Sequence, residues 1–111
     1  MKVAYVFTST NSQKILNNMI IPQLLGDEHG AEVAGMFFFM DNAFFLLEGT
    51  EMGTRLQELY DKTGLLLMAC DQCAYERGIA EKLIPGAHIG CFPHLYATLR
   101  SAGGVDQVIT L

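Results

Sequence analysis

The stretch LLLMACDQCAYERGIAEKLIPGAHIGCFPHLY, residues Leu65–Tyr96, contains the signals that decide the fold. Its first apolar residues, with Gly64 before them, suit a buried strand, and DQCAYERGIAEKL (Asp71–Leu83) has helical spacing. The same order then repeats, because GAHIGC (Gly86–Cys91) indicates a strand and PHLYATLRSAG (Pro93–Gly103) indicates a helix. Strands that alternate with helices through short loops are typical of α/β proteins with a parallel sheet.

The rest of the chain extends this alternation in both directions. Three further strands and two further helices are expected, at Lys2–Phe7, Ala31–Phe39, Val105–Leu111, Gln13–Leu25 and Thr54–Lys62. Pro22 lies inside one of these helical runs and indicates a kink or a break there. The pattern therefore predicts one domain, residues 1–111, in which helices cover both faces of a five-stranded parallel sheet. Right-handed crossovers would place the carboxyl ends of all strands along one edge.

Composition narrows the range of functions. Half of the 111 residues are hydrophobic and 17% are charged, which suits a buried core and excludes disorder. The net charge of −5 and the scattered seven Lys and Arg residues argue against a nucleic-acid partner. No apolar run reaches the roughly 18 residues of a membrane span, and the apolar part of MKVAYVFTST is too short for a signal peptide. We therefore expect a cytoplasmic protein without membrane insertion.

All three cysteines lie in the quoted stretch, and their odd number favours reduced thiols. Cys70 follows a predicted strand and begins a helix, where the helix dipole favours the thiolate, although the carboxylate of Asp71 opposes it. The alternative for Cys70 is the role of a small buried hydrophobic residue. Cys73 lies one turn further along the helix, and Cys91 ends the next strand. The three thiols converge only if the two strands are neighbours in the sheet.

The spacing of these residues leaves several kinds of site open. Cys70-x-x-Cys73 is a thiol redox motif, although the residues between the cysteines differ from the Gly-Pro of thioredoxins. Cys70, Cys73, Cys91 and His94 together resemble the spacing of zinc sites, but each pair begins a helix instead of forming a knuckle. That arrangement favours an open site for a soft metal ion over a closed zinc site. The glycines form no nucleotide-binding motif, so no other cofactor is expected. Arg77 either approaches an anion at this edge or forms a surface salt bridge.

An unusually apolar segment, GMFFFMDNAFFLL (Gly35–Leu47), precedes this stretch. Its five phenylalanines and two methionines exceed what one buried strand needs. The segment either belongs to the core or forms an exposed patch that becomes a subunit interface. We expect the interface, because the run continues from a strand end into a loop. Glutamate at Phe44 or Phe45 should then weaken a homo-oligomer and leave the fold intact.

The order of these motifs resembles the DsrE/DsrF/TusD-like family of small sulfur-handling proteins. The resemblance covers nearly the whole chain and rests on an apolar strand, a loop with Asp41, a helix that ends before Gly64, a strand that ends in Cys70, and the Gly78-Ile79 step. It implies a three-layer α/β/α sandwich, assembly into trimers or hexamers, and transfer of sulfur as a persulfide on Cys70.

Two departures from the family pattern keep other functions open. Cys73 and Cys91 are extra thiols, and Asp71 is not an activating neighbour of Cys70. The segments MACDQCA and GCFPHLY resemble a DsrE-related subgroup, which implies partners that handle thiol-bound soft metals or organometals. The first hypothesis is a sulfur carrier or sulfurtransferase that exchanges sulfur with protein donors and acceptors through a thiol site of Cys70, Cys73 and Cys91. The second is a soft-metal or organometal binding protein that uses the same cysteines, and the third is a dithiol/disulfide oxidoreductase.

Overall fold

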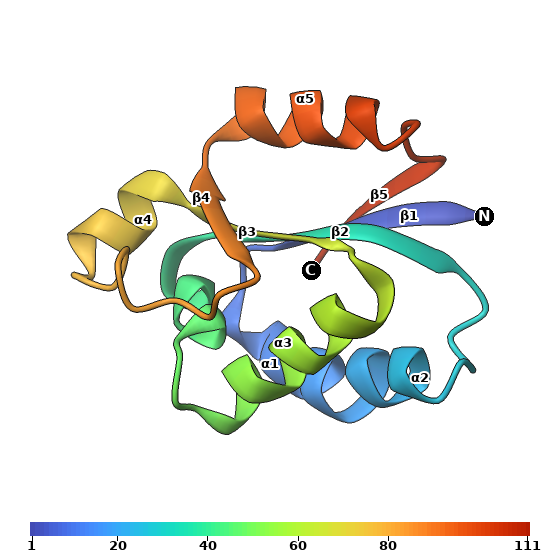
Figure 1. Ribbon diagram of the computed structural model, residues 1–111, viewed down its shortest axis with the longest axis horizontal. Helices are drawn as coiled ribbons and strands as arrows, with labels where there is room; N and C mark the ends of the chain where they lie inside the picture. The colour runs from blue at the N-terminus through green and yellow to red at the C-terminus, as the bar shows by residue number, and fades with distance from the viewer.

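The computed structural model describes residues 1–111 and consists of a five-stranded parallel sheet with helices on both faces (Figure 1). In chain order its elements are β1 (Lys2–Phe7), the short helical turn η1 (Thr10–Ser12), α1 (Gln13–Ile15), the π-helical segment η2 (Leu16–Ile20), α2 (Ile21–Leu25), β2 (Glu32–Phe38), the 3-10 helix η3 (Met40–Leu46), α3 (Glu51–Thr63), β3 (Leu66–Cys70), α4 (Asp71–Glu76), β4 (Ala87–Gly90), α5 (Phe92–Ser101) and β5 (Gln107–Thr110). The predicted α/β class and parallel sheet are confirmed.

The strand order is β4-β3-β2-β1-β5, and every neighbouring pair is parallel. The chain moves in one direction across the sheet from β1 to β4 and then returns past β1 to form β5. Because crossovers between parallel strands are right-handed, a reversal of direction sends the connecting helix to the opposite face. Figure 1 shows this result: α1, α2 and α3 lie on one face, and α5 lies on the other.

Several element ends differ from the predicted ones for local reasons. The helix α4 stops at Glu76 and not at Leu83, because Gly78 adopts a left-handed conformation with φ of 66°. The N–H of Ile79 then donates to the carbonyl of Ala74 at 3.0 Å and closes the helix end. The helix α3 begins earlier than predicted, because the side chain of Thr50 caps its first turn.

The helical run Gln13–Leu25 forms as predicted, and Pro22 does not interrupt it. Pro22 lies in the first turn of α2, and the residues before it, Leu16–Ile20, form the wider π-helical segment. A proline lacks the N–H that a helix interior requires, and a π-type turn is one way in which a helix accommodates the missing hydrogen bond. The backbone therefore stays helical through this position.

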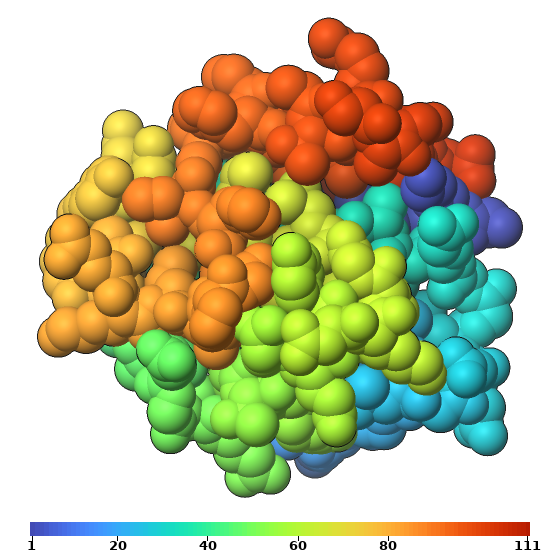
Figure 2. Space-filling view, viewed as in Figure 1, coloured from blue at the N-terminus to red at the C-terminus, as the bar shows by residue number.

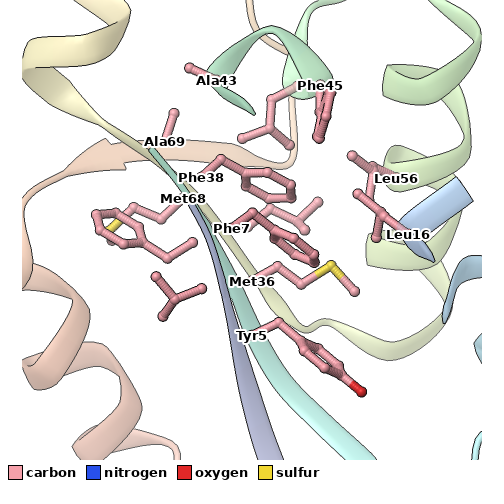
Figure 3. Close-up of a cluster of buried hydrophobic side chains, with 14 of the residues drawn as sticks. Tyr5, Phe7, Leu16, Met36, Phe38, Ala43, Phe45, Leu56, Met68 and Ala69 are labelled. Atoms are coloured by element: carbon pink, nitrogen blue, oxygen red, sulfur yellow. The ribbon is translucent and has the colours of Figure 1, made fainter. Parts of the chain in front are cut away.

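The core lies on both sides of the sheet. Along β1 and β2 successive side chains alternate between the faces, as strand geometry requires. In Figure 3, Phe7 and Phe38 point to the face that also receives Leu16 and Leu56, whereas Met68 points to the opposite face. The rings of Phe7 and Phe38 stack with centroids 5.1 Å apart. A strand that is buried on both faces has a nearly continuous apolar sequence, which is what β2 and β3 show.

The same burial accounts for the phenylalanine-rich segment. Phe38 packs edge-on against Phe45, with centroids 6.2 Å apart, while Phe37 faces the other way and contacts Phe92 of α5 at 5.9 Å. Phe37, Phe38 and Phe45 are all buried, and Phe44 is 41% exposed. The segment therefore belongs mainly to the core of the single chain, and the prediction that Phe45 lies at an interface is wrong.

The face covered by α5 is less completely filled. A mostly apolar cavity of about 620 Å³ lies between α5, β1 and β5, and Leu95, Leu99 and Val108 are among its lining residues. None of the cysteines lines it.

None of the helices combines the length and the hydrophobicity that crossing a lipid bilayer requires.

A hydrogen-bonded chain of three side chains connects β1 to α2 through the segment that follows α2. The hydroxyl of Tyr5 donates to Nε2 of His29 at 2.8 Å, and Nδ1 of His29 donates to the side-chain oxygen of Gln23 at 3.0 Å. Partial burial lowers the pKa of His29 in the folded chain. A histidine with a lowered folded pKa stabilises the fold fully above its unfolded value of 6.5, and this contribution is lost as the pH falls.

We therefore expect the free energy of unfolding to decrease as the pH falls below 6.5. Urea unfolding at a series of pH values measures this slope. The variant His29→Gln should lose part of it, whereas His88→Gln, at an exposed position, should keep it. Parallel pH profiles for the wild type and His29→Gln would contradict the assignment.

Candidate functional site

The three cysteines lie at or next to the carboxyl ends of the neighbouring strands β3 and β4. The helix α4, which follows β3, lies on the left in Figure 1. Cys70 is the last residue of β3 and the N-cap of α4, and Cys73 follows in the first turn of that helix. Cys70 pairs with Gly90 at the end of β4, and Cys91 comes next as the N-cap of α5. The condition for the thiols to approach one another, adjacent strands, is therefore met.

The thiol of Cys70 is buried, with 6% of its surface exposed. Burial raises the pKa of this thiol, and the neighbouring thiol of Cys73 raises the pKa further. The backbone N–H groups of Cys73 and Gln72 act in the opposite direction, but neither makes a capping hydrogen bond to the sulfur. The start of α4 favours the thiolate of Cys70 as expected, but burial outweighs this effect and the pKa of Cys70 is raised overall. The carboxylate of Asp71 accepts the N–H of Gln72 at 2.7 Å.

The thiol of Cys73 is held by the backbone of the η3 segment. Its Sγ accepts a hydrogen bond from the N–H of Met40 at 3.1 Å, and the side chain is 5% exposed. Met40 has a positive φ of 53°, a conformation that costs a non-glycine residue about 1–2 kcal/mol. Strain of this kind persists where the surrounding structure requires it, often at functional sites. The N–H of Met40 is directed at the sulfur and fixes its position.

An ion pair connects η3 to the end of α4. Nε of Arg77 lies 2.9 Å from Oδ1 of Asp41, and Nη1 of Arg77 donates to the backbone carbonyl of Cys73 at 3.2 Å. Of the two roles considered for Arg77, the structure shows the salt bridge. Asp41 is largely exposed, so this pair contributes little to stability, and its main effect is to fix the position of η3.

Cys91 and His94 interact with each other and not with the other two thiols. The N–H of Cys91 donates to Nδ1 of His94 at 3.2 Å, and Sγ of Cys91 accepts the backbone N–H of His94, so the two residues cap α5 reciprocally. A Cβ on Gly90 would lie 3.0 Å from Cβ of His94 and 3.1 Å from Sδ of Met68. Glycine at position 90 therefore permits the first turn of α5 to approach the sheet closely.

The four residues of the predicted metal site do not gather around one point. No group of three or more His, Cys, Asp or Glu side chains is arranged so that it could hold a metal ion. Cys70 and Cys73 form a pair, and Cys91 with His94 forms a separate cap. What the arrangement supplies chemically is a buried pair of thiols, with Cys91 as a partly exposed third thiol nearby.

Sequence reasoning missed two contributions from η3. The N–H of Met40 could not have been found, because every residue except proline carries one. Asn42 is fully buried, and neither its amide nitrogen nor its amide oxygen has a hydrogen-bond partner. Buried polar groups are almost always paired, so this side chain is an exception. The signal for it was the polar pair Asp41-Asn42 inside an otherwise apolar segment.

Solved structures from three organisms share this fold. They are the YchN protein from E. coli (TM-score 0.70, 21% identity, covering 99% of this chain and 97% of that one), protein MTH1491 from Methanobacterium thermoautotrophicum (0.67, 14%, 99% and 97%) and protein BT1422 from Bacteroides thetaiotaomicron (0.66, 16%, 99% and 94%). MTH1491 and BT1422 are described as proteins of unknown function. No curated protein matches the chain in sequence. The sequence pattern of the DsrE/DsrF-like family matches residues 1–109, and the chain belongs to this family.

Proposed function

We propose that this protein carries sulfur as a persulfide on Cys70 and acts as a sulfur carrier or sulfurtransferase. Membership of the DsrE/DsrF-like family points to a general role in sulfur relay. The observation that carries the finer proposal is the position of Cys70. It ends β3 at the carboxyl edge, where α/β sheets bind their ligands, and a second thiol lies beside it.

The reaction is a thiol exchange that needs no cofactor. The thiolate of Cys70 attacks the outer sulfur of a donor persulfide, R–S–SH. A bond forms between Sγ of Cys70 and that sulfur, the S–S bond of the donor breaks, and the donor leaves as the thiolate R–S⁻. The product is Cys70–S–SH. Attack by an acceptor thiolate on its outer sulfur passes the sulfur on and regenerates Cys70.

Protein partners would meet the chain at the carboxyl edge of the sheet. In Figure 2 the residues of α4 and of the segment that follows it form the left end of the molecule, next to the site. We further propose that the chain forms a homo-oligomer, a trimer or hexamer. The apolar surface available near the site includes Met40, Phe44 and Tyr75, which are 59%, 41% and 63% exposed.

Binding of a soft metal or organometal is the second proposal, and one observation favours it. The side chains of Cys70 and Cys73 lie beside each other, and two thiolates can hold a soft ion. Such a site would lack the third thiolate of Cys91 and the imidazole of His94, which cap α5 instead. Sulfur carriage requires only the thiol of Cys70, whereas metal binding requires at least two thiolates on one ion, so the observed geometry favours carriage.

A variant with a single thiol tests the two proposals together. The double variant Cys73→Ser/Cys91→Ser, reduced and then treated with glutathione persulfide, should gain the mass of one sulfur atom. Peptide mapping should locate this sulfur on Cys70. Native mass spectrometry of the wild type isolated without reductant, with its three cysteines, reports a bound metal in parallel. If the single-thiol variant gains no sulfur and the wild type carries a bound metal, metal binding becomes the better account of the function.

A further inference from the structure

We propose that Cys73 is a resolving thiol: it attacks the sulfur-loaded Cys70, releases the carried sulfur as sulfide and leaves a Cys70–Cys73 disulfide. This inference rests on the proposed persulfide at Cys70. It assigns the chain a further activity, reductive release of sulfide from a persulfide, which a carrier with one thiol cannot perform.

The first argument is the distance that the backbone imposes. Cys70 is the N-cap of α4 and Cys73 is the third residue of its first turn. Residues three apart in a helix have Cα atoms about 5 Å apart. Disulfides join cysteines whose Cα atoms are about 4.4–6.8 Å apart, so the bond can form without movement of the backbone. The side chain of Cys73 is close enough to raise the pKa of the Cys70 thiol.

The second argument is the environment of Cys73. The N–H of Met40, held in a strained backbone conformation, donates to Sγ of Cys73 at 3.1 Å. This hydrogen bond fixes the position of the Cys73 sulfur, and a thiolate is the form of cysteine that attacks a disulfide or persulfide. The ion pair between Asp41 and Arg77 and the bond from Arg77 to the carbonyl of Cys73 keep η3 in this position.

The third argument is that no other thiol competes for this role. Sγ of Cys91 accepts the backbone N–H of His94 in the cap of α5. The groups that act on the thiol of Cys70 are those of Cys73 and Gln72, and Cys91 is not among them. Cys73 belongs to the same chain as Cys70 and lies in the first turn of the helix that Cys70 caps, so its attack is intramolecular and is favoured over attack by a thiol from solution.

The proposed step balances without an added oxidant. The thiolate of Cys73 attacks Sγ of Cys70–S–SH, a bond forms between the two cysteine sulfurs, and the bond to the outer sulfur breaks. The outer sulfur takes the electron pair and leaves as HS⁻. It is reduced, and the two cysteine sulfurs are oxidised to the disulfide. A further turnover requires an external dithiol, which reopens the disulfide by exchange.

The test compares four forms of the reduced protein, each treated anaerobically with one equivalent of glutathione persulfide. Released sulfide and intact mass after acid quenching are measured. The wild type should release one sulfide per chain and lose the mass of two hydrogen atoms. Cys73→Ser and Cys73→Ala should keep the mass of one added sulfur atom. Their rate of sulfide release should be lower than that of the wild type by about tenfold or more, because intramolecular attack is lost. Cys91→Ser should behave like the wild type.

The outcomes separate this inference from the proposal on which it rests. If the wild type keeps the added sulfur and releases no sulfide, the resolving role is overturned and carriage on Cys70 stands. If Cys73→Ser and Cys73→Ala, folded by circular dichroism, take up no sulfur or retain glutathione instead, carriage on Cys70 is itself overturned. Position 73 is replaced by serine in one variant and by alanine in the other, so that the test still gives a result if one of them fails to fold.

Discussion

The variant Cys70→Ser is expected to lose all uptake of sulfur from a persulfide donor, although Cys73 and Cys91 remain. A hydroxyl at this position is not deprotonated at neutral pH and cannot replace the sulfur nucleophile. Cys73 is buried under Met40, and Cys91 caps α5, so neither occupies the end of β3. Intact mass and released sulfide after reaction with a persulfide donor measure the effect: Cys70→Ser should neither gain sulfur nor release sulfide, whereas the matched control Cys91→Ser should react like the wild type.

The pH dependence of loading adds a second measurement on the same protein. Because burial raises the pKa of Cys70, the thiolate is a minor form near neutral pH, and its fraction increases as the pH rises. The loading rate of the wild type should therefore increase with pH above neutrality. Equal loss of uptake in Cys70→Ser, Cys73→Ser and Cys91→Ser would contradict a single carrier and indicate a shared thiol cluster.

The fold could be predicted from the sequence because its signals are local and repeated. The alternation of apolar runs and runs with helical spacing predicted the order of strands and helices and the parallel sheet, and right-handed crossovers predicted that the strands' carboxyl ends share one edge. Strand order could not be obtained this way, since nothing local states that β5 returns to pair with β1. Helix ends shifted where a single residue decides the geometry, as Gly78 does for α4.

The candidate site could be predicted in part. Sequence spacing located Cys70 and Cys73 correctly at the carboxyl edge, because both depend only on the junction of β3 and α4. It could not show that Cys91 and His94 would satisfy each other in a helix cap, or that the N–H of Met40 would reach Cys73. These contacts depend on tertiary packing. The direction of the pKa shift at Cys70 could not be predicted for the same reason, since desolvation of the thiol depends on how the chain folds.

The neighbouring residues Phe44 and Phe45 provide the sharpest test of how the apolar segment packs. Phe45 is 8% exposed and packs against Phe38, whereas Phe44 is 41% exposed. Truncation of a buried phenylalanine costs about 3–5 kcal/mol, and a buried carboxylate without a partner costs several kcal/mol more. Domains of this size are stable by only about 5–15 kcal/mol. We therefore expect Phe45→Glu to be largely unfolded, as measured by circular dichroism and urea unfolding.

The same substitution one residue earlier is the control. Phe44→Glu places its carboxylate in solvent and should change the free energy of unfolding by about 1 kcal/mol or less, since surface substitutions rarely do more. If Phe44 contributes to the proposed homo-oligomer, light scattering should show a smaller particle for this variant than for the wild type. A folded Phe45→Glu that only dissociates would contradict its place in the core. Both variants have the same amino-acid composition and the same added charge. Any difference in stability between them therefore results from the different burial of the two positions.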